Sequence, residues 1–259
     1  MRRRATVRFL FGSAERSYVR SVHRLCGSLS HGLSFRWIVA GVVLLAGIGT
    51  VFVRRQLRQP YPMLPFDLLR IPVFSLSVLT SILSFTSQML GMVALPFMFH
   101  LTFGMNAAET GLLMTAWPLV IVVAGPLAGT LATKIHPGLL GGVGLLLMSV
   151  GCFLLADVSP SVGYGGLVAR LMLCGFGFGL FQSPNNHLLL SSAPSYRTGG
   201  ASGMQATARL VGQTTGAALV ALLFYLNGDR APHAAMWLAG GFTLCGSLVS
   251  CSRLRAHRF

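Results

Sequence analysis

Six long apolar stretches follow one another almost without interruption between Val73 and Cys251. A helix needs about 20 predominantly apolar residues to cross the hydrocarbon core of a bilayer, and these stretches have lengths of that order. In lipid, every backbone polar group must be satisfied internally, so the pattern predicts an all-α, polytopic membrane protein. The stretches are Val73–Leu101, Thr110–Ala132, Gly138–Ala156, Val162–Ser191, Gly203–Leu226 and His233–Cys251.

A seventh apolar stretch, Trp37–Val53, is shorter. The composition is that of a membrane protein: 53% of the residues are hydrophobic and 10% are charged, whereas a soluble domain has roughly 25% charged residues. We therefore expect a short transmembrane helix over residues 37–53 and a six-helix bundle over residues 73–252. Glycine pairs that suit close helix packing lie at Gly125–Gly129, Gly138–Gly142 and Gly212–Gly216.

The cations that flank these stretches fall on alternate loops. After residue 53, nine lie on one side and only Arg230 lies on the other. Because Lys and Arg collect in cytoplasmic loops, we expect a multi-pass protein of the plasma (inner) membrane with a cytoplasmic C-terminus. Residues 253–259 would be a basic cytoplasmic tail, and the turns near Asn106 and Ser159 would face outward. The nine cations are Arg54, Arg55, Arg58, Arg70, Lys134, Arg197, Arg253, Arg255 and Arg258.

The first 36 residues are strongly basic, with eight arginines and one acid, Glu15. Seven spans would place this segment on the side opposite the C-terminus, which conflicts with the positive-inside rule. Two explanations stay open: residues 1–36 are out-of-frame or disordered sequence, or they form a cytoplasmic arm while Trp37–Val53 lies in the membrane interface. We attribute the net charge of +15 to topology and anionic lipid headgroups, and expect no nucleic-acid partner.

Residues with catalytic or metal-binding chemistry are scattered. The five acids lie in different loops and helix ends, so no pair suggests acid–base catalysis. The seven histidines never recur three or four residues apart, which excludes a zinc motif on one helix, and the five cysteines contain no CxxC pair. We expect no enzyme activity, no metal and no cofactor.

Polar side chains inside the apolar stretches are the candidates for function. They are costly in lipid and usually face a partner helix or an aqueous cavity. The richest cluster runs from Gln182 to His187, where Pro184 should kink the helix. Taken singly, each residue is explained by an interhelical hydrogen bond; taken together, they favour a shared polar cavity. The candidates are Gln88, Gln182, Asn185, Asn186, Arg209 and Gln213.

Four segments resemble a known family. They are "RRQLRQPYPMLPFDLLRIPVFSLS", "LPFMFHLTFGMNAAETGLLMTAWPL", "GPLAGTLATKIHPGLLGGVGL" and "LCGFGFGLFQSPNNHLLLSSAPSYRTGGASGMQATARLVGQTTGAALVALL". In this order they are similar to the late helices of the major facilitator superfamily, and most of all to fourteen-span drug–proton antiporters of the EmrB/QacA type. The resemblance covers Trp37 to Leu254 and concerns the C-terminal half only, so the first six-helix bundle is missing.

The resemblance implies a transporter that works by alternating access, in which two bundles rock about a central site and substrate leaves against inward proton flow. In that fold, the first, second, fourth and fifth helices of the C-terminal bundle line the cavity. Trp117 thereby joins the candidates, and with Met89, Met92 and Met98 it would suit a small, flat, cationic amphiphile. Packing in the core or against lipid is the simpler explanation for these four residues.

Two features depart from the family pattern. The signature loop survives only as Gly129-Thr-Leu-Ala-Thr-Lys134, where Thr133 replaces the acid, and no acid lies in the middle of a span. The residue that couples protons is therefore unassigned. Besides the bilayer, we expect as partner a missing N-terminal bundle or a second copy of the chain. The alternatives are a membrane fragment without transport of its own and, less favoured, a membrane enzyme or assembly subunit.

Overall fold

The computed structural model describes Gly47, Val51 and residues 66–159 and 162–256. The basic segment at residues 1–36 lies outside the described residues, as does the expected helix at residues 37–53 apart from Gly47 and Val51. The chain divides into two units, Met1–Pro62 and Met63–Phe259, and the second unit contains the expected bundle.

The described part of the second unit is built from helices, as the sequence predicts. Two of them, α4 and α5, belong to one candidate span, Ala107–Leu131, because only Thr115 separates them. The last candidate span, Ser195–Arg253, contains both α8 and α9, so each of the six predicted stretches is helical. The elements are η1 Phe66–Arg70, α3 Pro72–Phe103, α4 Ala107–Met114, α5 Ala116–Leu131, α6 Pro137–Ala156, α7 Tyr164–Ser191, η2 Ser195–Arg197, α8 Thr198–Asn227, η3 Gly228–Arg230 and α9 Ala231–Ala256.

Local signals set the ends of the first helices. Pro72 begins α3, where its missing N–H breaks no hydrogen bond. Gly104 ends α3 with a φ of 64°, a left-handed cap that favours glycine. Asn106 then starts α4 with a capping box, in which its side chain accepts from the Glu109 N–H and the Glu109 carboxylate accepts from the Asn106 N–H.

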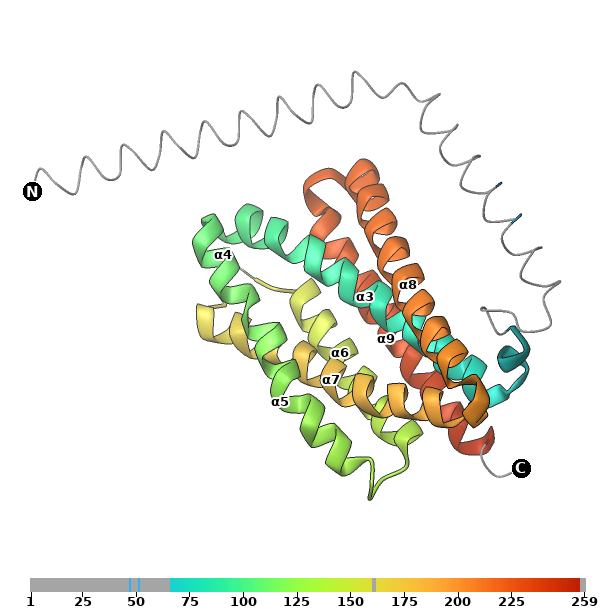
Figure 1. The fold of residues 1–259 in the computed structure, drawn as a ribbon. Helices are drawn as coiled ribbons and strands as arrows, with labels where there is room; N and C mark the ends of the chain where they lie inside the picture. The colour runs from blue at the N-terminus through green and yellow to red at the C-terminus, as the bar shows by residue number, and fades with distance from the viewer. Residues whose placement is uncertain (1–46, 48–50, 52–65, 160–161, 257–259) are drawn as a thin grey trace, which may run out of the picture. The chain divides into compact units, whose positions relative to one another are not determined.

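The helices pack side by side in the order α5, α7, α6, α9, α3 and α8, and Figure 1 shows α5 and α8 at opposite edges of the bundle. Helix α7 also contacts α3, where Phe178 lies edge-on to Phe85 with ring centroids 5.6 Å apart. Glycine permits the closest approaches: a Cβ added at Gly177 would lie 2.5 Å from the carbonyl oxygen of Gly144. The core lies where α3, α6, α7 and α9 meet.

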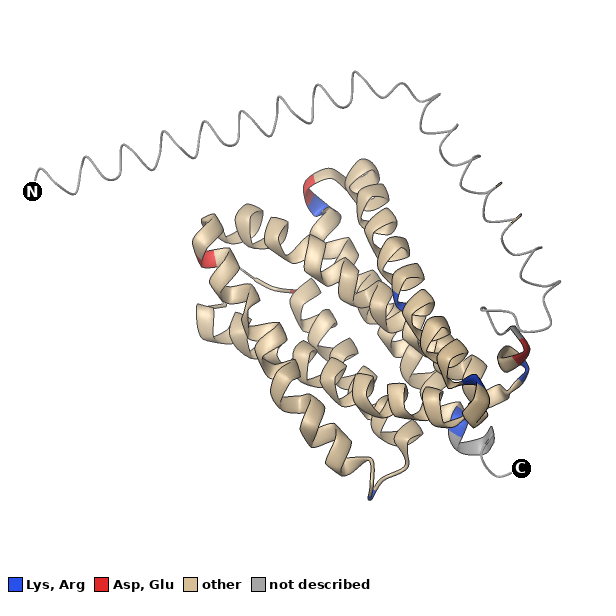
Figure 2. Cartoon of the chain, in the orientation of Figure 1, with Lys and Arg blue, Asp and Glu red and all other residues tan. Residues whose placement is uncertain are grey.

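Most charged residues gather near the ends of the helices (Figure 2). Arg197 forms an ion pair with Asp67 over 2.8 Å, which joins the start of α8 to the segment before α3. The side chain of Arg253, near the end of α9, donates to the carbonyl oxygen of Leu76 in the first turns of α3. Arg197 and Arg253 therefore lie at the same end of the bundle, termed the basic end below.

The end of α9 differs from the expected tail. The helix continues past residue 252 to Ala256, and the side chain of Arg253 is only 1% exposed. A count of flanking cations treats every terminal arginine as a loop residue. Here the last turn of α9 stays helical and packs on α3, so Arg253 points into the bundle instead of into solvent.

Candidate translocation site

Gln182 and Asn186 lie on the part of the α7 surface between the side that contacts α3 and the side that contacts α5. On one side, the Asn185 amide donates to a hydroxyl of α3. On the other side, Ser183 lies against Gly129 at the end of α5, where an added Cβ would be 3.7 Å from its Oγ. At 100° per residue, positions 182 and 186 fall between these two directions, and both side chains are half-buried. They therefore point between α3 and α5.

On α3, Gln88 continues a row of serines that the sequence reading overlooked. Ser81 and Ser84 are buried, whereas Gln88 is half-buried and Met92, one turn further, is 39% exposed. Ser81 receives the Asn185 hydrogen bond, so this row faces α7. The serines and Gln88 recur every three or four residues, and this spacing in the sequence already indicated that they share one side of a helix. The row consists of Ser77, Ser81, Ser84 and Gln88.

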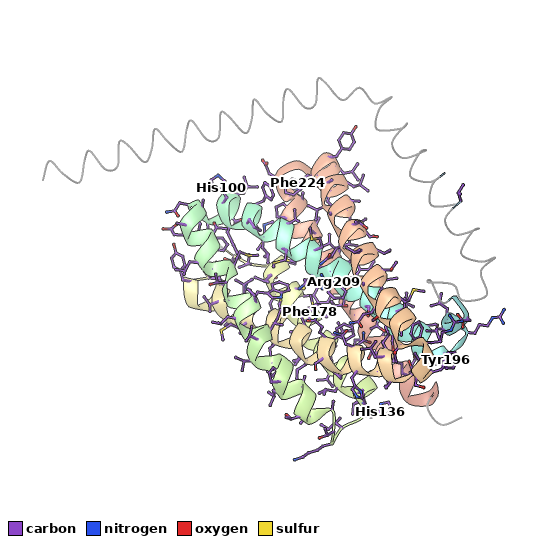
Figure 3. All side chains as sticks on the ribbon, viewed as in Figure 1. His100, His136, Phe178, Tyr196, Arg209 and Phe224 are labelled. Carbon is purple, nitrogen blue, oxygen red and sulfur yellow. The ribbon has the colours of Figure 1, made fainter. Side chains whose placement is uncertain are left out.

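On α8, Arg209 and Gln213 lie one turn apart. Gly212 packs on α3, since the Thr86 hydroxyl of α3 donates to the Gly212 carbonyl oxygen over 3.2 Å. A Cβ added at Gly216 would lie 2.6 Å from the Thr86 carbonyl oxygen. Gln213 is half-buried beside this contact, and Arg209 is exposed about halfway along α8 (Figure 3). The structure thus places candidate side chains on three neighbouring helices, α3, α7 and α8.

Trp117 lies apart from these residues. Its side chain is 0% exposed, and it packs against Gly91 of α3 and Gly175 of α7. Its indole N–H has no acceptor among the described residues. Within this bundle Trp117 is a core residue, which leaves its proposed contact with substrate a prediction.

The three methionines expected beside Trp117 do not share one surface. Met98 is fully buried, Met89 is half-buried and Met92 is exposed. Met98 is therefore a core residue, whereas Met89 and Met92 are at least partly accessible. Two serine hydroxyls of α9 bind α6: the Ser247 hydroxyl donates to the Gly142 carbonyl oxygen over 2.8 Å, and the Ser250 hydroxyl to that of Gly138 over 2.9 Å.

Asn185 takes part in a network that the sequence reading missed. It is 2% exposed, its Nδ2 donates to Ser81 Oγ over 2.8 Å, and its Oδ1 accepts from Arg253 Nη1 over 2.8 Å. Both ends of the amide are therefore occupied, which separates Asn185 from its half-buried neighbour Asn186. No sequence signal marked Arg253, because arginines in a C-terminal run are ordinarily loop cations.

The polar candidates that are half-buried or exposed can offer hydrogen bonds and one positive charge. We term these five side chains the polar face, since we expect them to line one path: Gln88, Gln182, Asn186, Arg209 and Gln213. Within the described residues, no group of three or more His, Cys, Asp or Glu side chains could hold a metal ion. The described carboxylates lie at or beyond the ends of the long helices: Asp67, Glu109, Asp157 and Asp229.

Comparison with known proteins identifies similar chains. The family model described as Major Facilitator Superfamily matches residues 25–217 and 77–257. The uncharacterized transporter YebQ of Escherichia coli is 48% identical over 229 residues, which cover 88% of this chain and 50% of YebQ. The multidrug efflux pump LfrA of Mycolicibacterium smegmatis is 27% identical over 180 residues, 68% of this chain and 35% of LfrA.

The multidrug resistance protein Stp of Mycobacterium tuberculosis is 26% identical over 228 residues, which cover 85% of this chain and 42% of Stp. The chain thus spans half the length of YebQ and less than half of LfrA and Stp. The family match, the apolar helices and the absence of strands among the described residues agree with one another. The chain is a multi-pass membrane protein that belongs to the major facilitator superfamily.

Proposed function

We propose that this bundle forms one side of the substrate path of a drug-efflux transporter, and that it corresponds to the C-terminal half of a fourteen-span antiporter. The polar face carries this proposal. Gln88, Gln182 and Gln213 are half-buried on α3, α7 and α8, three helices that contact one another. Polar side chains within apolar helices are expensive in lipid, and several on one face suit a water-filled cavity.

Such a face requires a cover inside the membrane. The bundles of this superfamily are related by an axis along the membrane normal, and YebQ has twice the length that this chain matches. A second bundle, either from the unmatched part of a longer transporter or from a second copy of this chain, would close the cavity. Rocking of the two bundles would then expose the polar face to each side in turn.

The proposed substrate is a small, flat, cationic amphiphile. LfrA and Stp are named for multidrug efflux and multidrug resistance, which supports a broad, greasy site. Met92 adds an exposed, polarisable side chain beside Gln88, and such side chains adapt to varied ligands. Because the four described carboxylates lie near helix ends, we place the proton-coupling group in the covering bundle. We place the basic end in the cytoplasm, where Lys and Arg collect.

One alternative has an observation in its favour. The described residues form a single bundle, so the chain also fits a partner-dependent membrane fragment with no transport of its own. Nothing in the described residues favours a membrane enzyme or assembly subunit.

The test replaces Gln88, Gln182 and Gln213 singly with Leu in the full chain, supplied with the half of YebQ that this chain does not match. Ethidium efflux should fall about tenfold or more, the effect of about 1.4 kcal/mol on a barrier, at unchanged membrane abundance. Thr214→Val is the control, because this exposed hydroxyl bonds only the carbonyl oxygens of Leu210 and Val211 in its own helix. Normal efflux in all three Leu variants would reject the polar face as the path.

A further inference from the structure

Arg253 is a buried cation held by neutral groups. Its Nη1 donates to Asn185 Oδ1 over 2.8 Å, and its Nη2 donates to the Leu76 carbonyl oxygen over 3.0 Å and to the Thr80 hydroxyl. Among the described residues no carboxylate pairs with it, and its Nε has no acceptor. Removal of a charged group from water is costly, and these three hydrogen bonds offset part of that cost.

These bonds of the Arg253 guanidinium, together with the Asn185 amide, join three helices. Arg253 belongs to α9, Asn185 to α7, and Leu76 and Thr80 to α3. The Asn185 amide is fixed at both ends, since its Nδ2 donates to Ser81 Oγ over 2.8 Å. The orientation of α7 relative to α3 at this level is therefore set by hydrogen bonds that α9 completes.

A neutral side chain could fill this site at a lower desolvation cost. The dipole of α9 favours a cation in its last turn, where Arg253 lies, but no carboxylate among the described residues neutralises the charge. What a guanidinium adds is a planar fork of donors that fixes two partners at a defined angle. The choice of arginine therefore indicates a need for geometry beyond simple packing.

The position of Asn185 connects this geometry to the polar face. Asn186 is the next residue along α7, and Gln182 lies one turn before it. Any rotation of α7 about its axis at Asn185 would turn both half-buried side chains toward α3 or toward α5. We propose that Arg253 is a positioning residue, which fixes Asn185 and thereby aims Gln182 and Asn186 into the substrate path. The proposal rests on the proposed function only in taking the side chains of Gln182 and Asn186 to line the substrate path.

The test uses the full chain in membranes, with native cysteines replaced and Asn186→Cys as a reporter. The measured quantity is the rate at which this thiol reacts with a membrane-impermeant maleimide. Arg253→Met should change the rate about fivefold or more, which corresponds to about 1 kcal/mol in conformer population. Arg253→Lys, which keeps the charge but loses the fork, should restore part of the difference.

Ser247→Ala is the matched control, because it removes another buried hydrogen bond of α9, one that reaches the Gly142 carbonyl oxygen of α6 and not α7. Its labelling rate should equal that of the parent. An unchanged rate in well-folded Arg253→Met, judged by a single monodisperse peak in detergent, would overturn the proposal.

A second variant guards against misfolding of the first. Asn185→Leu, alone and combined with Arg253→Met, should give the same labelling rate as Arg253→Met, because contacting residues act through one interaction and are not additive. Additive effects would overturn the proposal. Labelling requires no transport, so normal efflux in the glutamine variants would reject the proposed function while these rates still decide the role of Arg253.

Discussion

The indole ring of Trp117 on α5 lies against Gly91 of α3, where an added Cβ would be 3.2 Å from the Cη2 atom of the ring. The backbone of Trp117 comes still closer to α7, since a Cβ added at Gly175 would lie 2.5 Å from the Trp117 carbonyl oxygen. Glycine thus lets three helix backbones converge on one aromatic side chain, and this junction fixes α5 at the edge of the bundle.

Gly175→Ala should therefore destabilise the bundle. The new Cβ meets a backbone carbonyl, which cannot move aside like the end of a side chain, and overpacking of this kind costs about 1–3 kcal/mol. Thermal unfolding of the purified chain in detergent measures the loss. Gly241→Ala is the control within α9, because an added Cβ there meets nothing within 4 Å. Equal midpoints for the two variants would contradict the close contact.

The helices were predictable because lipid leaves little choice of secondary structure. Val162–Ser191 was expected, and α7 runs from Tyr164 to Ser191. Glycine spacing was less reliable. Gly212 does pack on α3, where an added Cβ would lie 2.7 Å from the Ile82 carbonyl oxygen, but a Cβ at Gly125 would meet nothing within 4 Å. Spacing shows that a helix could pack closely, whereas the neighbouring helix decides whether it does.

Topology can be tested with single cysteines in a background without native cysteines. Because cations concentrate in cytoplasmic loops, a cysteine at exposed Ala108 should react with an impermeant maleimide from outside, and one at Tyr196, 82% exposed, should react only after the membrane is opened. Ala108 is preferable to Asn106, whose side chain caps α4. The reverse pattern of labelling would invert the proposed orientation.

The polar residues were visible in the sequence, but their surroundings were not. Gln88, Gln182 and Gln213 stood out as single amides in apolar runs, which the sequence alone shows, and their place in a substrate path stays a prediction. The roles of Asn185 and Trp117 did not stand out, because these depend on what lies opposite: Arg253 from a terminal segment in one case, Gly91 and Gly175 in the other. Pairings across the bundle leave no local signal.

Arg209 provides a test of the substrate's charge. It is exposed midway along α8, one turn before Gln213. A cationic substrate about 8 Å from its guanidinium would be repelled by about 2 kcal/mol at an effective dielectric constant of about 20. With the unmatched half of YebQ supplied, Arg209→Gln should lower the KM for ethidium about threefold or more without a loss of kcat. Lys134→Gln, at the α5–α6 turn, is the control. An unchanged KM would place Arg209 outside the path.

The chain of 259 residues, produced without a second bundle, should not export drugs. Alternating access requires two bundles that rock about a shared site, and the described residues between 66 and 256 form one. Cells that make only this chain should therefore show no added resistance to ethidium, although the protein reaches the membrane. Uncoupler-sensitive dye efflux from liposomes that contain the purified chain alone would contradict this, and would show that two copies pair through their polar faces and that a group within this chain carries the proton.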